Sequence, residues 1–349
     1  MISTTSPRGT TDVDAADAVV EAMAEAARWA PSVHNTQPWV LRRLPDGLRV
    51  AVDDARALPV LDPDARLRTI SCGAAAANAA IAAAGLGVRT STRLLPDGPR
   101  AAAVADVLVT GPREATEWDR ALARAVAVRR THRRLHARGD LGPELLDALR
   151  AVAADVGARL VVLDDLGRHR LARLLVRAAH EQERNPRLLA ETRSWLRPPR
   201  GHHEPHPTDG ILLASLGTTP YPTDSIVREV GHVSRLTGSP VRDEVEASTT
   251  VVLMTPGDGR RDHAVAGLAL ERVWLEATAA GVVATFADQA TQQRVTRDDV
   301  SALAGLPGHA QLVLRLGRPL VDVRIPPRRP LADVLDPAPH ATTEGSPRS

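Results

Sequence analysis

Residues 30–39, APSVHNTQPW, combine two prolines, two hydroxyl side chains and two amide side chains in one short segment. An amide side chain offers both a donor and an acceptor. Asn35 and Gln37 could therefore match the edge of a planar polar heterocycle, on which donors and acceptors alternate. The same composition is also typical of a rigid connector between a helix and a strand, in which the amides bind the local backbone. The residues alone leave both interpretations open.

Arginine side chains gather at two other places in the chain. Residues 129–134 read RRTHRR, and Arg328 and Arg329 lie between prolines further along. A guanidinium group binds phosphate oxygens through two parallel hydrogen bonds, and a threonine hydroxyl adds another donor. Each run taken alone can equally be a solvated surface. Two arginine clusters together with an amide-rich loop suggest a phosphorylated planar cofactor.

Other kinds of reactive site have weaker support. The single cysteine, Cys72, lies among alanines and glycines, a context typical of a small buried core residue rather than a nucleophile. His202, His203 and His206 lie where no regular element would orient them, which favours an exposed loop over a zinc site. The motifs of P-loop proteins, zinc hydrolases, thiol oxidoreductases and α/β-hydrolases are absent. We therefore predict no catalytic side chain and no metal.

Composition argues against two classes of partner. Aromatic residues make up only 2% of the chain, so stacking platforms for single-stranded nucleic acid are not expected. The formal net charge is +2, and arginines and acidic residues are interspersed along the chain, which argues against a DNA-binding stripe. The polar start lacks the apolar core of a signal peptide, and no run of about 18 apolar residues occurs. We expect a cytoplasmic protein with no nucleic-acid or membrane partner.

Helices and strands must position these residues. The predicted order is a helix, strands, a helix and strands, and this order occurs twice along the chain. Asp12 or Asp14 can cap the first helix, and Pro45-Asp46-Gly47 is a turn sequence that predicts a hairpin. Residues 186–245 are rich in proline, glycine and histidine, and we expect an irregular segment there that is a functional lid or mobile. The predicted helices cover residues 14–29, 68–86, 143–152, 171–183 and 262–280, and the predicted strands cover residues 39–43, 48–53, 104–109, 160–163, 250–254 and 311–316.

A faint internal repeat relates two of the predicted helices. Gly73 lies near the start of one and Gly87 closes it, while Gly267 and Gly281 occupy the corresponding places in the other, at the same spacing. The match indicates two related halves, or it is a coincidence between two alanine-rich helices. If the halves are related, glycine and alanine on the facing sides would let the two helices approach closely.

Five segments, in the same order, resemble the nitroreductase superfamily, and specifically its tandem Acg-like branch. The resemblance covers most of the chain, from about Ala26 to Leu335. The segments are residues 30–39 (the PSxxNxQPW loop), 70–87 (the CGAAxxN…LG helix), 129–133 (the RRSxR motif, with Thr131 at the serine position), 308–317 (a strand near the family's end) and 327–335 (the closing Arg-Arg-Pro-Leu segment).

The resemblance implies an α+β, nitroreductase-like fold of two fused halves. The halves would form an intramolecular pseudo-dimer, with central helices flanked by antiparallel-type sheets. We expect them to cover residues 13–125 and 126–336, the second with a lid-like insertion at about 186–245. The chain has one PSxxN loop in its first half and one arginine set in its second, which implies a monomer that holds one FMN between its halves.

The resemblance also implies roles for individual residues. Arg129, Arg130, Thr131, Arg133, Arg328 and Arg329 would surround the phosphate and ribityl chain of FMN. Pro31, Ser32 and Asn35 would contact the flavin from the other half, and Asp288 and Gln289 would lie near flavin N5. Gln37 and Trp39 would anchor the loop. In place of the family's Pro-Leu-Ser-Gln, this chain has Phe-Ala-Asp-Gln at residues 286–289, so Asp288 would add negative charge near the ring.

The implied activity is an FMN-dependent oxidoreductase of the nitroreductase type. Hydride from NADH or NADPH would pass through FMN to a small-molecule acceptor, such as a nitro compound or a quinone. The alternative is an FMN-binding protein that sequesters a lid-covered flavin with little or no turnover. A third interpretation, a scaffold without flavin, predicts a protein that stays colourless when FMN is added.

Overall fold

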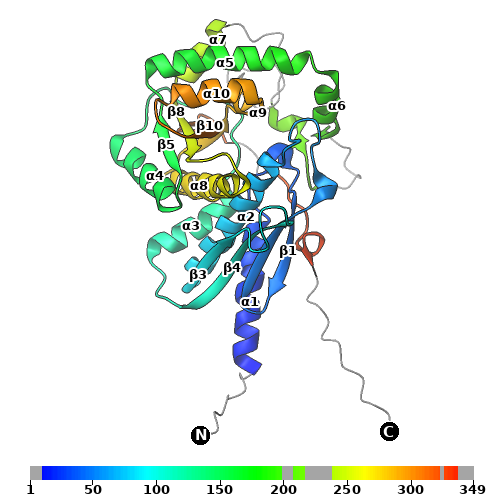
Figure 1. The fold of residues 1–349 in the computed structure, drawn as a ribbon. Coiled ribbons are helices and arrows are strands. Elements are labelled where there is room, and N and C mark those ends of the chain that lie inside the picture. Colours follow the sequence, from blue (N-terminus) through cyan, green and yellow to red (C-terminus); the bar gives the residue numbers. More distant parts are fainter. Residues whose placement is uncertain (1–9, 199–206, 217–237, 323–325, 337–349) are drawn as a thin grey trace, which may run out of the picture.

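The computed structural model describes residues 10–198, 207–216, 238–322 and 326–336 of the chain. Within these ranges two main open sheets lie on either side of a pair of long central helices, as Figure 1 shows. The mixture of helices with mainly antiparallel sheets confirms the predicted α+β class. The loop that begins at Pro31 leads into the first sheet, and residues 286–289 end a strand of the second sheet and follow it.

The first sheet is built on the hairpin that the sequence predicts. β1 (Trp39–Leu44) and β2 (Gly47–Val52) pair antiparallel, and the strand order is β11-β1-β2-β4-β3. Buried side chains of the hairpin, among them Trp39 and Leu41, pack in one core with the alanines of the central helix. The other elements of this part are α1 (Thr10–Ala27), α2 (Arg66–Gly85), β3 (Val88–Leu94), β4 (Ala103–Pro112) and α3 (Glu117–Val128).

The second sheet is antiparallel throughout, with strand order β5-β8-β10-β9. Its central strand β8 (Thr249–Thr255) is buried along its whole length, because helices cover both of its faces (Figure 1). Its other strands are β5 (Arg159–Val162), β9 (Val283–Phe286) and β10 (His309–Gly317), and its helices are α4 (Pro143–Asp155), α5 (Asp165–Glu183), α7 (Gly238–Glu246), α8 (Arg260–Ala279), α9 (Gln289–Gln292) and α10 (Arg294–Leu303).

The two central helices, α2 and α8, cross at the glycines of the internal repeat. A Cβ atom placed on Gly73 would lie 2.3 Å from the carbonyl oxygen of Ala264, and one on Gly267 would lie 2.0 Å from the carbonyl oxygen of Ile70. The contact is reciprocal, as between the two copies in a symmetric dimer. Gly87 and Gly281 end the two helices with φ angles of 76° and 73°. The close approach predicted from the repeat is confirmed.

The end of the chain returns to the first sheet. Short β11 (Leu335–Asp336) pairs parallel with β1, and the backbone N–H of Leu41 donates to the carbonyl oxygen of Val334 at 2.7 Å. Arg328 and Arg329 precede this strand, so β11 holds them beside the first sheet. The division of the chain into two halves at about residue 125 stays a prediction. β11 belongs to the second predicted half but pairs with a strand of the first, which the expected boundaries do not describe.

The insertion at residues 186–245 is more regular than predicted. It contains α6 (Pro186–Ser194), and β6 (Leu196–Arg197) pairs parallel with β7 (Ile211–Leu212). Asn185 caps α6 by accepting a hydrogen bond from the backbone N–H of Leu188 at 3.1 Å, and Pro186 suits the first helical turn. The expectation of an irregular segment is wrong here because these residues start a helix instead of preventing one. The predicted loop histidines, His202, His203 and His206, lie outside the described residues.

Helix α2 also has the length and hydropathy of a membrane span. However, 72% of its apolar window is buried inside the protein, where Cys72 and its alanine neighbours pack against both sheet and helix. Packing in the core therefore accounts for the hydropathy of α2. Cys72 is fully buried, as its sequence context predicts.

Candidate functional site

A cleft opens between the two central helices, at the loop that begins with Pro31. It encloses about 450 Å³ of space between atoms, part of it open to solvent. Loop residues form one wall, and the segment after β9 forms another, so both predicted halves contribute. The lining residues are Pro31, Ser32, Val33, Leu67, Ile70, Ser71, Leu270, Phe286, Asp288, Gln292 and Leu312. Of the predicted site residues, the structure places Pro31, Ser32 and Asp288 directly on the cleft.

The loop has an unusual backbone for residues that are not glycine. His34, Asn35 and Gln37 have φ angles of 49°, 54° and 51°, in the left-handed region that most side chains avoid. The backbone N–H of Gln37 donates to the Ser32 hydroxyl at 2.9 Å, which closes the loop on itself. Three such residues within four positions are stable only when surrounding contacts hold them.

The amide side chains supply those contacts. Asn35 donates from Nδ2 to the carbonyl oxygens of Gly210 and Pro327, both at 3.1 Å. Gln37 donates from Nε2 to the carbonyl oxygen of Thr208 at 2.8 Å and accepts at Oε1 from the backbone N–H of Arg329, also at 2.8 Å. Gln37 therefore anchors the loop, as expected. The Asn35 amide is engaged with the backbone here, and its contact with a flavin stays a prediction.

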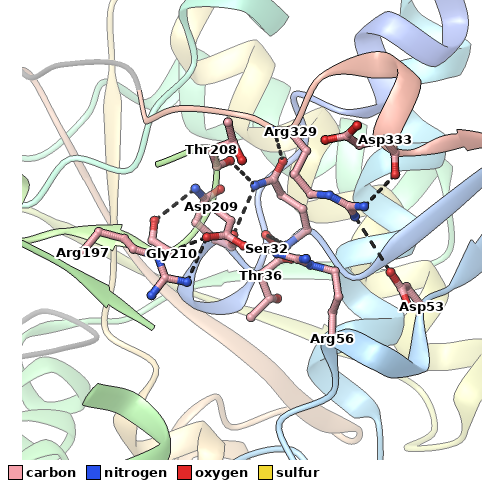
Figure 2. A network of polar contacts seen from close by, with 12 residues as sticks. Ser32, Thr36, Asp53, Arg56, Arg197, Thr208, Asp209, Gly210, Arg329 and Asp333 are labelled. Carbon is pink, nitrogen blue, oxygen red and sulfur yellow. Dashed lines mark hydrogen bonds and ion pairs between the residues drawn. The ribbon is translucent and has the colours of Figure 1, made fainter. Parts of the chain in front are cut away.

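The insertion is fastened to this loop by an ionic latch, which Figure 2 shows from close by. Asp209 accepts hydrogen bonds from Arg56 on the first-half side and from Arg197 at 2.9 Å within the insertion. The backbone N–H of Gly210 also donates to the carbonyl oxygen of Asn35 at 3.2 Å. Burial by itself would raise the pKa of Asp209, but the two guanidinium groups outweigh it and hold the pKa below the usual value. The carboxylate therefore stays charged, and residues 208–210 lie against the loop.

We expect Asp209→Asn to loosen this latch. The change removes the charge from two ion pairs, with Arg56 and Arg197, that comprise three hydrogen bonds. A hydrogen bond to a charged group is typically worth about 1.5–3 kcal/mol, although solvent screens part of this at a half-buried site. The backbone amide of Gly210 should then exchange with solvent about tenfold faster in hydrogen–deuterium exchange. The matched control is Asp147→Asn, which removes an exposed partner of Arg150 on α4. Equal protection of Gly210 in all three proteins would contradict the assignment.

Arginines from both sequence clusters meet at the start of the loop. Arg129 and Arg328 both donate to the carbonyl oxygen of Trp29, and Arg328 also donates to that of Ala30 at 3.1 Å. Both arginines are buried, with Arg129 2% and Arg328 8% exposed. The turn that begins at Pro31 thus lies directly beside both guanidinium groups, although they come from segments far apart in the sequence.

One buried carboxylate, Glu271, faces these arginines among the described residues. Its Oε1 lies 3.4 Å from Nε of Arg129. Burial raises the pKa of Glu271, against the attraction of Arg129 and Arg328. Burial also lowers the pKa of Arg328 well below its usual value, and the like charge of Arg129 adds to that shift. The cluster therefore carries more buried positive charge than Glu271 can balance, which favours an added anion.

The remaining residues of the first arginine cluster have different surroundings. Arg133 is buried and close enough to His34 to affect its pKa, and Thr131 forms a bridge with Ala284 of β9. Arg130 pairs with Asp322 at 3.2 Å.

Arg329 and Gln289 are two further predicted residues whose surroundings the structure shows. Arg329 donates to the carbonyl oxygen of Asp333 at 2.6 Å and lies 3.9 Å from Asp53 (Figure 2). Arg130 and Arg329 are each paired with an acidic residue here, and their contact with a phosphate stays a prediction. Gln289 is buried at the start of α9, next to the cleft residue Asp288.

Asp288 is a buried carboxyl group on the wall of the cleft. Its Oδ1 accepts from the backbone N–H of Val313 at 2.8 Å and from the Thr291 hydroxyl at 3.5 Å. Burial raises the pKa of Asp288 to about 7, against the lowering effects of the Val313 N–H and of Arg66. The carboxyl group is therefore only partly charged near neutral pH, which reduces the negative charge expected from its sequence position.

Comparison with known proteins identifies the family. No family model matches the chain. A protein of Mycobacterium tuberculosis, "Uncharacterized protein Rv3127", is 30% identical over 325 residues, which cover 88% of this chain and 89% of that protein. From the same organism, "Putative NAD(P)H nitroreductase Rv3131" is 29% identical over 326 residues (88% of each chain), and "Putative NAD(P)H nitroreductase acg" is 27% identical over 327 residues (91% of this chain and 95% of that one). The chain belongs to the Acg-like branch of the nitroreductase superfamily.

Solved nitroreductases give shorter matches to this Acg-like chain. The FMN-dependent nitroreductase NfnB of Mycobacterium smegmatis, in complex with NADPH, is 19% identical with a TM-score of 0.40, over 62% of this chain and 97% of NfnB. A nitroreductase of Bacteroides fragilis with bound FMN is 14% identical with a TM-score of 0.36, over 58% of this chain and 92% of that protein.

One buried residue of the loop, His34, could not be singled out from the sequence. His34 is 3% exposed, and neither ring nitrogen has a hydrogen-bond partner among the described residues. Sequence reasoning assigned no role to this residue within the loop, because a lone histidine carries no spacing signal. The available hint was its place in the chain, directly before Asn35 of the motif loop.

Proposed function

We propose that this Acg-like chain binds one FMN in the cleft beside Pro31 and transfers electrons from NADH or NADPH to a small-molecule acceptor. A single observation carries the proposal. Buried arginines from two distant segments meet at the loop of an apolar-walled cleft, with Glu271 as the described carboxylate against Arg129 and Arg328. In a phosphorylated planar heterocycle, the phosphate would match the arginines and the ring would match the apolar cleft.

The donor set fits the phosphate of FMN. Two buried guanidinium groups against one carboxylate leave a surplus of positive charge, and a phosphate monoester would balance it. Arg129 and Arg328 already bind the carbonyl oxygen of Trp29, which fixes their positions before a ligand arrives. We infer that Arg129, Arg133 and Arg328 hold the phosphate, whereas Thr131 lies along β9 towards the ribityl chain.

The walls of the cleft fit the ring. Leu67 and Ile70 of α2, Leu270 of α8 and Phe286 of β9 line the cleft, and apolar walls of this kind exclude water from a planar ligand. Ser32, Asp288 and Gln292 supply polar groups at its edges. Bound FMN would supply the hydride chemistry, and the chain would orient the ring and shield it. No protein side chain is assigned as an acid or base.

Sequestration of FMN is the second candidate, and the latch favours it. Asp209 and Gly210 fasten the insertion to the loop that lines the cleft, so the insertion restricts access to a bound ligand. A closed latch would slow the entry of a nicotinamide or an acceptor without affecting retention of FMN.

We also infer that the protein is a cytoplasmic monomer whose two halves form one site.

Two measurements test these proposals. Addition of FMN to the purified protein should give a bound flavin spectrum, and anaerobic NADPH or NADH should then bleach the colour if the protein is an oxidoreductase. Persistent colour with FMN bound would support sequestration instead. A protein that binds no FMN would overturn both.

Arg133→Gln tests the phosphate assignment. Loss of a charged donor to a phosphate costs about 1.5–3 kcal/mol, so we expect FMN affinity to fall about tenfold to a hundredfold. Riboflavin lacks the phosphate, and its affinity should change less than about threefold. Arg124→Gln, an exposed arginine on α3 that pairs with Glu117 at 2.8 Å, is the matched control. Equal losses for the two flavins would refute a phosphate contact.

A further inference from the structure

His34 is a buried imidazole whose hydrogen-bonding capacity is not used within the described part of the chain. Its two ring nitrogens are enclosed by protein, and neither has a partner there. Leaving a buried donor or acceptor unpaired typically costs about 1–3 kcal/mol. Native proteins keep few such groups, and those they keep are frequently found at sites that bind something.

The loop holds this imidazole in a defined place. The φ angle of His34 is 49°, and Asn35 and Gln37, which follow it, are also left-handed. The hydrogen bonds of Asn35 and Gln37 to Gly210, Pro327, Thr208 and Arg329 hold the strained backbone. Strain that is held so firmly is typical of sites arranged before the ligand arrives. The position of His34 is therefore determined by the protein and does not depend on a ligand.

The surroundings of His34 indicate what it would bind. The preceding residues Pro31, Ser32 and Val33 line the cleft, and Arg133 is the charged group that acts on the ring. Burial, together with the nearby Arg133, lowers the pKa of His34 to about 4. The ring is therefore neutral near pH 7, with one N–H donor and one acceptor nitrogen. Beside a guanidinium group, its N–H suits an oxygen that accepts hydrogen bonds.

We propose that His34 is a further binding residue of the site, and that its imidazole donates a hydrogen bond to an oxygen of the bound flavin nucleotide beside Arg133. The proposal rests on the proposed function. Two sources could supply that oxygen, namely the phosphate group and a carbonyl of the ring. Both are acceptors that an N–H and a guanidinium can share, and the choice of ligand separates them.

The first test compares flavins in binding titrations. We expect His34→Ala to weaken FMN binding about tenfold, and His34→Asn, which keeps a donor and tolerates the left-handed backbone, to recover most of the loss. If riboflavin binding is unchanged in His34→Ala, the oxygen belongs to the phosphate. If riboflavin is weakened equally and its bound absorption bands shift, the oxygen belongs to the ring. The control is His169→Ala, because His169 is half-exposed and pairs loosely with Glu246.

The second test is made on the wild-type protein and uses a variant only to assign the signals. The ring ¹⁵N signals of His34, identified by their loss in His34→Asn, should shift when FMN is added. Unchanged His34 signals with FMN bound, or FMN affinity within twofold of wild type in His34→Ala, would overturn the proposal.

Failure of the proposed function gives a different result from failure of the His34 assignment. If the wild-type protein binds no flavin, the proposed function fails. Inorganic phosphate then decides whether His34 belongs to an anion site at all. If the His34 ring signals shift when phosphate is added, His34 keeps its assignment as a phosphate-binding residue. If they do not shift, that assignment is wrong.

Discussion

Gly267→Ala is expected to prevent the two central helices from packing and to leave little folded protein. The added Cβ atom would lie 2.0 Å from the carbonyl oxygen of Ile70 and 2.8 Å from Cα of Gly73. Both are backbone atoms of the opposite helix, so relief requires α2 and α8 to separate along their whole contact. We expect a loss of stability of about 4 kcal/mol or more, measured as a fall in the urea midpoint or in soluble yield.

A glycine on the same helix provides the control. Gly259 caps α8, and a Cβ atom there would lie 3.5 Å from Oδ2 of Asp262, an ordinary contact distance. Gly259→Ala should therefore cost less than about 1 kcal/mol, mainly through a poorer helix cap. Gly73→Ala should behave like Gly267→Ala, because the contact is reciprocal. Wild-type stability in Gly267→Ala would show that the helices do not cross so closely.

The second large effect is expected at Asp288 and depends on pH. Burial raises the pKa of its carboxyl group from 3.8 to about 7 in the folded protein. Between these values the folded state binds a proton that the unfolded state does not, so this group's contribution to stability decreases as pH rises from about 4 to 7. The full shift corresponds to about 4 kcal/mol. Asp288→Asn, which keeps an oxygen for the Val313 N–H, should remove this dependence.

Urea unfolding at several pH values measures this effect. The stability of Asp288→Asn relative to wild type should be near zero at pH 4 and should increase in favour of the variant up to pH 8. Asp258 is a contrasting control, because hydrogen bonds from Gln311 and His263, with the charge of Arg297, outweigh burial and lower the pKa of its carboxyl group. Asp258→Asn should therefore destabilise the protein at neutral pH and less so in acid. A constant difference between Asp288→Asn and wild type across this range would refute the assignment.

Much of the local architecture was determined by the sequence itself. The turn at Pro45-Asp46, the two long small-residue helices and the glycines that end them depend on neighbouring residues, because turn and helix-end conformations are chosen within a few positions. The repeated glycines also predicted the helix crossing, since only a residue without a side chain permits that distance. The motif segments were recognisable for the same reason, because each lies within a short stretch of chain.

Only the tertiary structure decided which partners these residues have. The sequence could not show that β11 returns to β1, that Gln37 joins the insertion to the residues before β11, or that Asp209 binds Arg56. Nor could it separate Arg129 and Arg328, which meet at Trp29, from Arg130, which pairs with Asp322. The arginines are alike as residue types. Their environments differ because packing removes water from some guanidinium groups and leaves others in solvent, and burial of that kind depends on segments far apart in the chain.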